Sequence, residues 1–284
     1  MTKNKHIMIL VQRILLIAAI CLFAAESVNA QDSLSRPVTS VYRLEGGATN
    51  ARSTYLSPLR YSGTLWGVSG EWTKAFQKKP EHLIMSFAGA MNYRNMLNPP
   101  HSARMLGFDA KFNWGMAYRW RMPNNIQLAA GALLDINGGA LYLTRNGNNP
   151  VTVIASAGID IDLSVSWHFK IGRLPILVSD RLQIPSLGAF FSPEYGETLF
   201  EIYLGNRKGL AHCGWWGNNF GVGNLLSFKL DFGRTAMELG YRYDFRSFYA
   251  NHLVTRTAVN SFVIGVIPQG LGLKRKIKAN YAGY

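Results

Sequence analysis

Histidine and serine residues that could form a hydrolytic site are few in this sequence. A serine hydroxyl becomes a nucleophile when an adjacent base, most often histidine, takes its proton. The candidates are His101 with Ser102, His212, and His252 with Ser247. None of them stands in a His-x-Ser arrangement on the apolar face of an extended segment. We therefore predict no catalytic residues and keep hydrolysis as the alternative activity.

Two carboxylates, Asp160 and Asp162, share one face of an extended chain because they are two residues apart. Such a pair could contribute to a calcium site, but calcium takes about six to eight oxygen ligands. Arg181 or Lys170 could bridge the two carboxylates instead. Residues 221–223, Gly-Val-Gly, lack the following helix that a nucleotide-binding loop needs. The sequence predicts no metal and no cofactor.

Most charged residues occupy the minority face of alternating segments. In residues 106–120 apolar and aromatic side chains take every second position, which is typical of a strand and not of a helix. The same alternation recurs in residues 159–170, 226–232 and 237–246. We expect the polar face to line the interior of a barrel, with these candidate site residues: Asp109, Lys111, Arg119, Asp135, Asp160, Asp162, His168, Arg181, Glu201, Lys229, Asp231, Glu238, Arg242 and Asp244.

The beginning of the chain has the features of an export signal. Lys3, Lys5 and Arg13 precede an apolar run at residues 14–25, and small residues at 28–30 form a cleavage site. The run is too short for a permanent membrane helix. We therefore expect residues 1–30 to be removed, residues 31–267 to form the barrel, and residues 268–284 to form a basic periplasmic tail.

An alternating apolar face can pack on the core of a soluble sandwich or face lipid. The export signal and the many aromatic residues on the apolar face favour lipid, and thus a single antiparallel transmembrane barrel in the outer membrane. About twelve strands are expected, at 38–46, 60–76, 82–94, 104–121, 126–142, 151–170, 174–190, 198–204, 209–216, 220–232, 235–246 and 257–267.

The region from Thr198 to Trp216 is short for two strands, so ten strands are the alternative. Tight turns are expected at 77–80, 123–125, 172–173, 205–209 and 233–235, and longer loops at 95–103, 145–150 and 247–256. Short turns on one side and long loops on the other are typical of outer-membrane barrels with periplasmic termini.

Inward charges can be paired across the expected turns. Lys229 falls opposite Glu238, and Lys111 falls opposite Asp135, with Asp160 as a diagonal neighbour. Further inward charges are expected at Arg43, Glu45, Glu71 and Arg94. These residues predict a salt-bridged, narrow interior, and a selectivity constriction for small solutes is the alternative role of the same residues.

The chain carries 30 Lys and Arg against 16 Asp and Glu, a net charge of +14. The basic residues are scattered singly along strands and in turns, so we expect no nucleic-acid partner. Basic turns at a membrane face suit lipid phosphates or an acidic partner. Outer-membrane lipid and an outer-membrane protein complex are the expected partners.

Three segments resemble those of Gram-negative outer-membrane β-barrels from families of unknown function. They are Thr54-Tyr55-Leu56-Ser57-Pro58-Leu59-Arg60-Tyr61, Pro193-Glu194-Tyr195-Gly196-Glu197 and Phe262-Val263-Ile264-Gly265-Val266. Such barrels often end on an aromatic residue of the last strand, whereas here residues 268–284 follow it.

The resemblance itself points to no defined activity. The dense filling of the interior by inward charges, and the lack of a nucleophile with its base at the rim, predict a non-enzymatic barrel with a narrow or occluded lumen, which is either a structural or accessory protein or a small-solute pore. The alternative is an outer-membrane lipid hydrolase of the phospholipase or lipopolysaccharide deacylase type.

Overall fold

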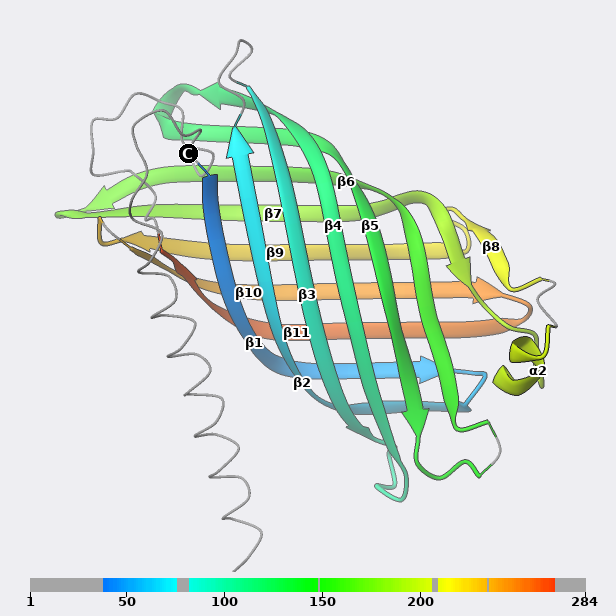
Figure 1. Ribbon diagram of the computed structural model, residues 1–284. Coiled ribbons are helices and arrows are strands. Elements are labelled where there is room, and N and C mark those ends of the chain that lie inside the picture. The colour runs from blue at the N-terminus through cyan, green and yellow to red at the C-terminus, as the bar shows by residue number, and fades with distance from the viewer. Residues whose placement is uncertain (1–37, 76–81, 148, 206–208, 234, 269–284) are drawn as a thin grey trace, which may run out of the picture. The chain divides into compact units, whose positions relative to one another are not determined.

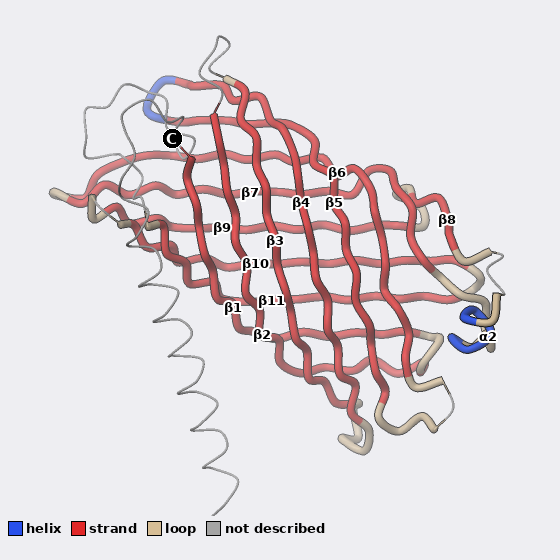
Figure 2. The backbone as a smooth tube through the Cα atoms, viewed as in Figure 1, coloured by secondary structure: helices blue, strands red, loops and turns tan. Residues whose placement is uncertain are grey.

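The computed structural model describes residues 38–75, 82–147, 149–205, 209–233 and 235–268. The expected signal segment, and all but the first residue of the expected tail, lie outside them. The described chain is almost entirely β-structure (Figures 1 and 2). The barrel strands are β1 (Val38–Ser53), β2 (Ser57–Ala75), β3 (Leu83–Leu97), β4 (Arg104–Met122), β5 (Ile126–Leu143), β6 (Val151–Ile171), β7 (Leu174–Phe191), β9 (Asn219–Asp231), β10 (Ala236–Ala250) and β11 (Leu253–Ile267).

These strands form a closed antiparallel barrel of ten strands. Each strand pairs with its neighbours in sequence, except that β7 pairs with β9 and bypasses the short β8. The first and last strands close the ring through a ladder that runs from Tyr42 opposite Val266 to Ser53 opposite Thr255. Closure pairs the backbone groups of both terminal strands, which is the condition for a β-structure to exist without water around it.

Ten is the smaller of the two strand numbers that the sequence left open, and the expected count of twelve is wrong. The segment expected as a strand at 198–204 is instead a short helix, α2 (Leu199–Tyr203), which starts with a capping box of Thr198 and Glu201. The segment expected at 209–216 contains only β8 (Ala211–Gly214), which pairs with the last residues of β7. Thr-x-x-Glu is a helix start signal that overrides a weak alternation.

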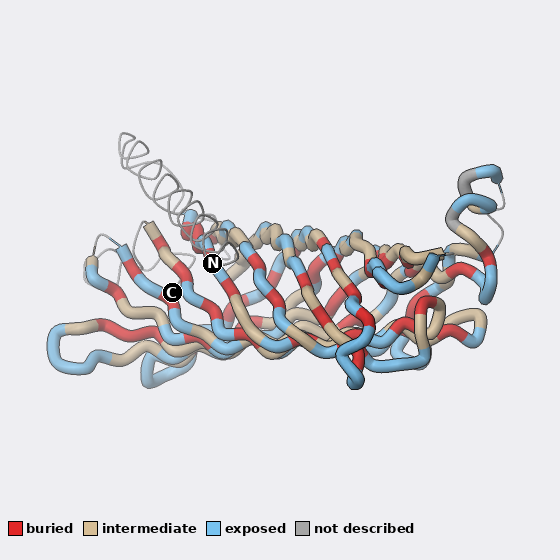
Figure 3. Tube along the Cα trace, turned by 90° about the horizontal axis from the view of Figure 1, so that it is seen from below, coloured by how far each residue is buried: buried red, intermediate tan, exposed pale blue. Residues whose placement is uncertain are grey.

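Buried or half-buried residues alternate with exposed ones along much of the barrel wall (Figure 3). The outer face carries exposed large apolar residues on all ten strands, among them Tyr42, Trp66, Met91, Phe108, Leu134, Ile159, Leu187, Phe228, Leu239 and Phe262. The inner face carries the buried charged residues. No helix in the described part of the chain is long and apolar enough to cross a membrane.

The connections differ between the two ends of the barrel. The loop end carries residues 54–56, 98–103, 144–150, 192–218 and 251–252, and the turn end carries 123–125, 172–173 and 232–235. The loop expected at 247–256 is wrong, because β10 and β11 are joined by Asn251 and His252 alone. Both have positive φ, 50° and 61°, as in the two-residue turns that match strand twist.

The lumen at the loop end is filled by apolar side chains. The cluster consists of Ala51, Leu56, Tyr61, Met96, Ala103, Met105, Leu141, Leu143, Ile154, Phe190 and Phe248. Two hydrogen bonds join loops above it, from Tyr55 Oη to the Glu197 carbonyl at 2.5 Å and from Asn146 Nδ2 to the Leu56 carbonyl at 3.2 Å. Burial raises the pKa of Tyr55, and Glu197 and Glu201 add to the rise, so the hydroxyl stays a donor. The mouth is therefore covered.

Removing part of this apolar cluster should destabilise the barrel. Met96 on β3 is fully buried in the cluster, whereas Met91 on the outer face of the same strand is 57% exposed. We expect Met96→Ala to lower the free energy of unfolding by about 2–5 kcal/mol, because it opens a cavity in a packed interior. Urea unfolding in detergent micelles measures this loss. Met91→Ala is the matched control, and an equal loss in both variants would contradict the packed cluster.

Candidate functional site

The middle of the lumen holds a chain of ion pairs that begins on β1. The guanidinium of Arg43 contacts two carboxylates, with Nη1 at 2.7 Å from Glu71 Oε2 on β2 and Nε at 2.6 Å from Glu238 Oε2 on β10. All three side chains are largely shielded from solvent. Lys229 on β9 adds a weaker contact at the end of the chain, where Nζ lies 3.9 Å from Glu238 Oε1.

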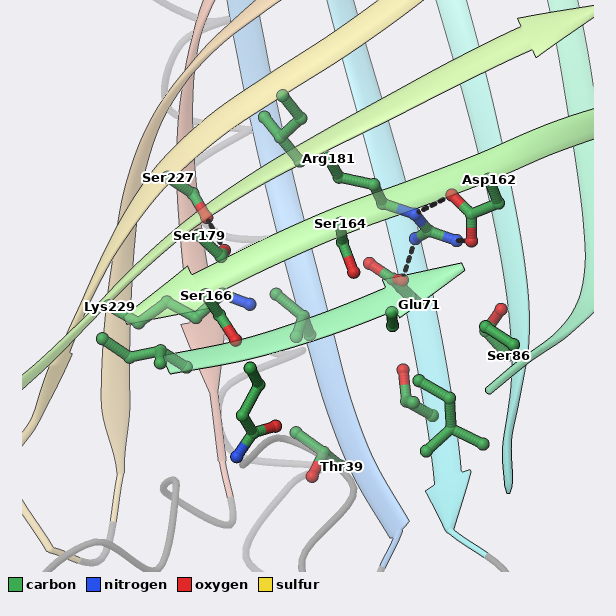
Figure 4. A pocket seen from close by; sticks show the side chains of 18 of the residues that line it. Thr39, Glu71, Ser86, Asp162, Ser164, Ser166, Ser179, Arg181, Ser227 and Lys229 are labelled. Carbon is green, nitrogen blue, oxygen red and sulfur yellow. Dashed lines mark hydrogen bonds and ion pairs between the residues drawn. The ribbon is translucent and has the colours of Figure 1, made fainter. Parts of the chain in front are cut away.

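Arg181 carries this chain across the barrel (Figure 4). Its Nη1 lies 2.5 Å from Glu71 Oε1. Its Nε and Nη2 donate to the two oxygens of Asp162 at 2.7 and 2.8 Å, a bidentate contact. Arg181 is on β7 and Glu71 is on β2, and these strands are five places apart in the ring of ten in either direction. The chain Asp162–Arg181–Glu71–Arg43–Glu238–Lys229, here called the main ion-pair chain, therefore spans the lumen.

A second group of ion pairs crosses the lumen nearer to the loop end. Arg246 Nη2 on β10 lies 2.5 Å from Asp135 Oδ2 on β5 and 3.1 Å from Asp160 Oδ2 on β6. Lys111 Nζ lies 3.2 Å from Asp135 Oδ1, and the Asn113 amide donates to the same oxygen at 2.7 Å. Two carboxylates and two cations thus balance one another.

Two smaller pairs complete the interior. Asp109 forms an ion pair with Arg94 on the neighbouring strand and accepts a hydrogen bond from Asn92 Nδ2 at 2.9 Å. Arg242 Nε lies 3.3 Å from Glu45 Oε2.

Glycines on the inner face leave room for these bulky groups. A Cβ atom at Gly265 would lie 2.9 Å from Glu238 Oε2, and one at Gly67 would lie 2.8 Å from Glu45 Oε1. Charged side chains removed from water need their partners within reach, since an unpaired buried charge costs several kcal/mol. The small inner positions are therefore part of the charge arrangement.

The expected cross-strand pairs form, one of them in a different register. Lys229 is the register partner of Glu238, as predicted. Lys111 is opposite Asn137, two residues from the predicted partner Asp135, because the turn is centred on Asn124 and not on Pro123. A two-residue shift keeps both side chains on the same face, so Lys111 still reaches Asp135 diagonally.

Glu201 is the one candidate site residue that the structure places outside the barrel. It lies exposed on α2, where its carboxylate accepts hydrogen bonds from the backbone and hydroxyl of Thr198. These bonds lower the pKa of Glu201. The expectation that it lines the lumen is wrong, because its segment is a helix.

The other candidates lie on barrel strands but differ in what they contact. Asp231 at the end of β9 accepts a hydrogen bond from the Gly233 amide at 2.7 Å, and so it shapes the turn. Arg119 is buried on β4, while His168 and Asp244 are half-buried on β6 and β10. Arg246 was absent from the candidate set although it joins two carboxylates, and the alternation in residues 237–246 is the signal that would have added it.

A cavity of about 140 Å³ opens beside the main ion-pair chain, on the side of the turn end (Figure 4). Seven hydroxyl side chains line it together with Arg119, Gln127 and Lys229: Thr39, Thr73, Ser86, Ser164, Ser166, Ser179 and Ser227. Ser179 and Ser227 hydrogen-bond each other at 2.9 Å. Arg43, Glu71 and Arg181 also line the cavity. It has the volume of roughly five water molecules.

The hydrolytic candidates do not come together with a serine hydroxyl in the contacts of the described residues. His212 Nε2 lies 3.1 Å from the Ser192 carbonyl and 3.4 Å from Asn251 Nδ2. His101 and His252 occupy connecting segments with positive φ. The described residues also contain no group of three or more His, Cys, Asp or Glu side chains that could hold a metal ion.

Residues 11–276 match the family model described as Protein of unknown function (DUF3316). No curated protein matches the chain. Among solved structures, the chain is similar to Neisserial surface protein A (NspA), with 11% identity, 80% of this chain and 96% of that chain covered, and a TM-score of 0.32.

Two autotransporter domains are similar in the same way. The transport unit of AIDA-I from Escherichia coli is 10% identical, with 88% of this chain and 97% of that chain covered and a TM-score of 0.41. The translocator domain of NalP from Neisseria meningitidis is 8% identical, with coverages of 90% and 97% and a TM-score of 0.37.

Breaking the main ion-pair chain at Arg181 should cost more than removing a balanced pair. Arg181→Met leaves the Asp162 carboxylate without its bidentate partner, and we expect a loss of about 3 kcal/mol in the free energy of unfolding. The double variant Arg181→Met/Asp162→Asn should recover at least about 1 kcal/mol of that loss. Urea unfolding in detergent measures both variants. Arg104→Met, at an exposed arginine, is the control, and additive losses at 181 and 162 would contradict the coupling.

Proposed function

The chain belongs to the DUF3316 family of proteins of unknown function, and we propose that it is an outer-membrane β-barrel with an occluded lumen and a structural or accessory role. The proposal has two parts, the place of the barrel and the state of its lumen.

The distribution of side chains over the two faces supports a place in a membrane. Exposed aromatic and aliphatic residues lie on the outer face of all ten strands, while the charged residues of the strands lie mainly inside the barrel. This is the arrangement of a barrel wall in lipid. The longest connection, residues 192–218, lies at the loop end, and long loops face outward in outer-membrane barrels. We therefore place the turn end, where β1 begins and β11 ends, in the periplasm, together with the tail that follows.

The contact between Arg181 and Glu71 carries the proposal of an occluded lumen. It joins opposite walls of the barrel at 2.5 Å. A solute that passes through would have to separate these partners and then displace the apolar cluster at the loop end. Barrels of about eight strands are filled by their own side chains, whereas barrels of about sixteen hold an aqueous channel. A ten-stranded barrel whose lumen holds the main ion-pair chain and the apolar cluster resembles the eight-stranded kind.

The hydroxyl-lined cavity at the turn end favours a second candidate, a pore for small polar solutes. In that case the main ion-pair chain is a constriction that opens during passage, and the apolar cluster must move as well.

For the accessory role, an outer-membrane protein complex is the partner that fits.

Electrical recording separates the two candidates. We expect the full chain, reconstituted in a planar lipid bilayer, to show no single-channel steps, because both the ion pairs and the apolar cluster block the path. Protease protection in liposomes verifies that the barrel has inserted, and a sixteen-stranded porin in the same bilayer is the positive control. Reproducible conductance steps from the inserted protein would overturn the occluded lumen and favour the pore.

A further inference from the structure

Three arginines stand side by side on the outer face of the barrel near the loop end. Arg52 on β1 is the register partner of Arg256 on β11. Arg60 on β2 directly precedes Tyr61, the partner of Ala51, and so it lies next to Arg52 at the bulge of this ladder. All three are exposed, whereas Ala51 and Tyr61 are buried inside. Arg52, Arg60 and Arg256 are here called the arginine row.

The arginine row has no counter-charge within the described part of the chain. The polar contact of Arg256 is a hydrogen bond from Nε to Ser247 Oγ at 3.1 Å, which leaves its charge unbalanced. Like charges directly opposite each other destabilise a sheet. An anion that accepts hydrogen bonds from two or three guanidinium groups would turn this repulsion into attraction, and phosphate has enough acceptor oxygens to bond several guanidinium groups at once.

On β1, β2 and β11 the outer face next to the arginine row is small and polar before it becomes aromatic, and Leu97 of β3 and Phe245 of β10 flank this zone. Going from the row towards the middle of the barrel, register partners on β1, β2 and β11 form three successive levels. The first two levels contain amide, hydroxyl and methyl side chains, and the third begins the apolar band. The levels are Asn50, Ser62 and Ala258, then Ala48, Thr64 and Asn260, and then Gly46, Trp66 and Phe262.

The height of this polar zone decides which headgroup fits. Six residues separate Arg52 from Gly46, which is about 20 Å along a strand and about 15 Å along the axis of a barrel with tilted strands. The headgroup zone of an ordinary bilayer is only about 5–7 Å deep on each side. A phosphate at the arginine row therefore needs a headgroup about twice as tall as that of a phospholipid, with groups that bond amides and hydroxyls on the way. A phosphorylated sugar has both properties.

The two ends of the barrel differ in this respect. At the turn end the outer face of the described strands carries a single cation, Lys74. At the loop end the outer face carries the arginine row and, two strands away from Arg60, Arg104 on β4. In the proposed membrane, the barrel therefore presents different outer surfaces to the two leaflets.

We propose that the arginine row and the polar levels beside it bind the phosphorylated sugar headgroup of a glycolipid in the leaflet at the loop end. The phosphate lies on the guanidinium groups of Arg52, Arg60 and Arg256. The sugar contacts the polar levels, and the acyl chains run along Trp66 and Phe262. The inference rests on the proposed placement of the barrel in the outer membrane with the loop end outward.

Lipid binding by the full chain in detergent micelles tests this site. The probe is lipid A with both phosphates, and its dissociation constant is measured by native mass spectrometry. We expect Arg52→Gln/Arg256→Gln to raise the dissociation constant about 25-fold, at about fivefold for each arginine near a lipid phosphate. The control variant Lys74→Gln/Arg173→Gln removes the same charge at the turn end and should change it less than about twofold. Circular dichroism verifies that both variants are folded.

The lipid itself provides the second arm. Dephosphorylated lipid A and phosphatidylglycerol should both bind the wild-type chain at least about tenfold more weakly, because one lacks the phosphates and the other lacks the tall sugar. Equal affinity for phosphatidylglycerol, or equal losses in the two double variants, would overturn the site. Failure of the wild-type chain to insert into liposomes would contradict the proposed membrane location, whereas an inserted barrel without lipid preference contradicts only this inference.

Discussion

A charged side chain that points into a ten-stranded barrel has little water around it and must find its partner on another strand. The contact of Arg181 with Glu71 and Asp162 shows how this constraint organises the interior. Cations and carboxylates alternate along the main ion-pair chain, so each charge has an opposite neighbour and the sum is zero. Inner glycines such as Gly265 keep space for the partners. Strand register, glycine placement and ring closure are all tied to these pairs, because a shift of one residue would turn the charges of a strand to the apolar outer face.

The pattern of the sequence was sufficient to predict the ten barrel strands, their two faces and the Lys229–Glu238 pair, whereas the register of Lys111 was predicted two residues off. Lys229 and Glu238 could be predicted as partners because a tight turn fixes their register. The contact of Glu71 with Arg181 could not, because 110 residues separate them and only the closure of the ring brings them together. The prediction of two barrel strands in residues 198–216 was wrong for another reason. A short apolar segment fits a strand or a helix, and the Thr198 capping box decided for the helix.

The loop end shows a second consequence of a narrow ring. Its interior is apolar, with Phe190 and Phe248 in contact at a ring distance of 5.1 Å. Such side chains could not be exposed to an aqueous channel without cost, so they pack together and exclude water. The loops above them are held by Tyr55 and Asn146. In the proposed occluded lumen, ion pairing in the middle and apolar packing at the loop end therefore close the same passage by different physical means.

In the barrel with an occluded lumen that we propose, recognition takes place on the outside. Two kinds of surface are available there, the apolar outer wall of the barrel and the connection between β7 and β9 at the loop end. This connection exposes Phe200, Leu204, Trp215 and Trp216, which are the residue types that partners and membrane interfaces bind. The wall beside it changes within three levels from arginine to aromatic residues. These exposed residues take no part in the packing of the lumen, and we infer that lipid or another protein contacts the barrel there.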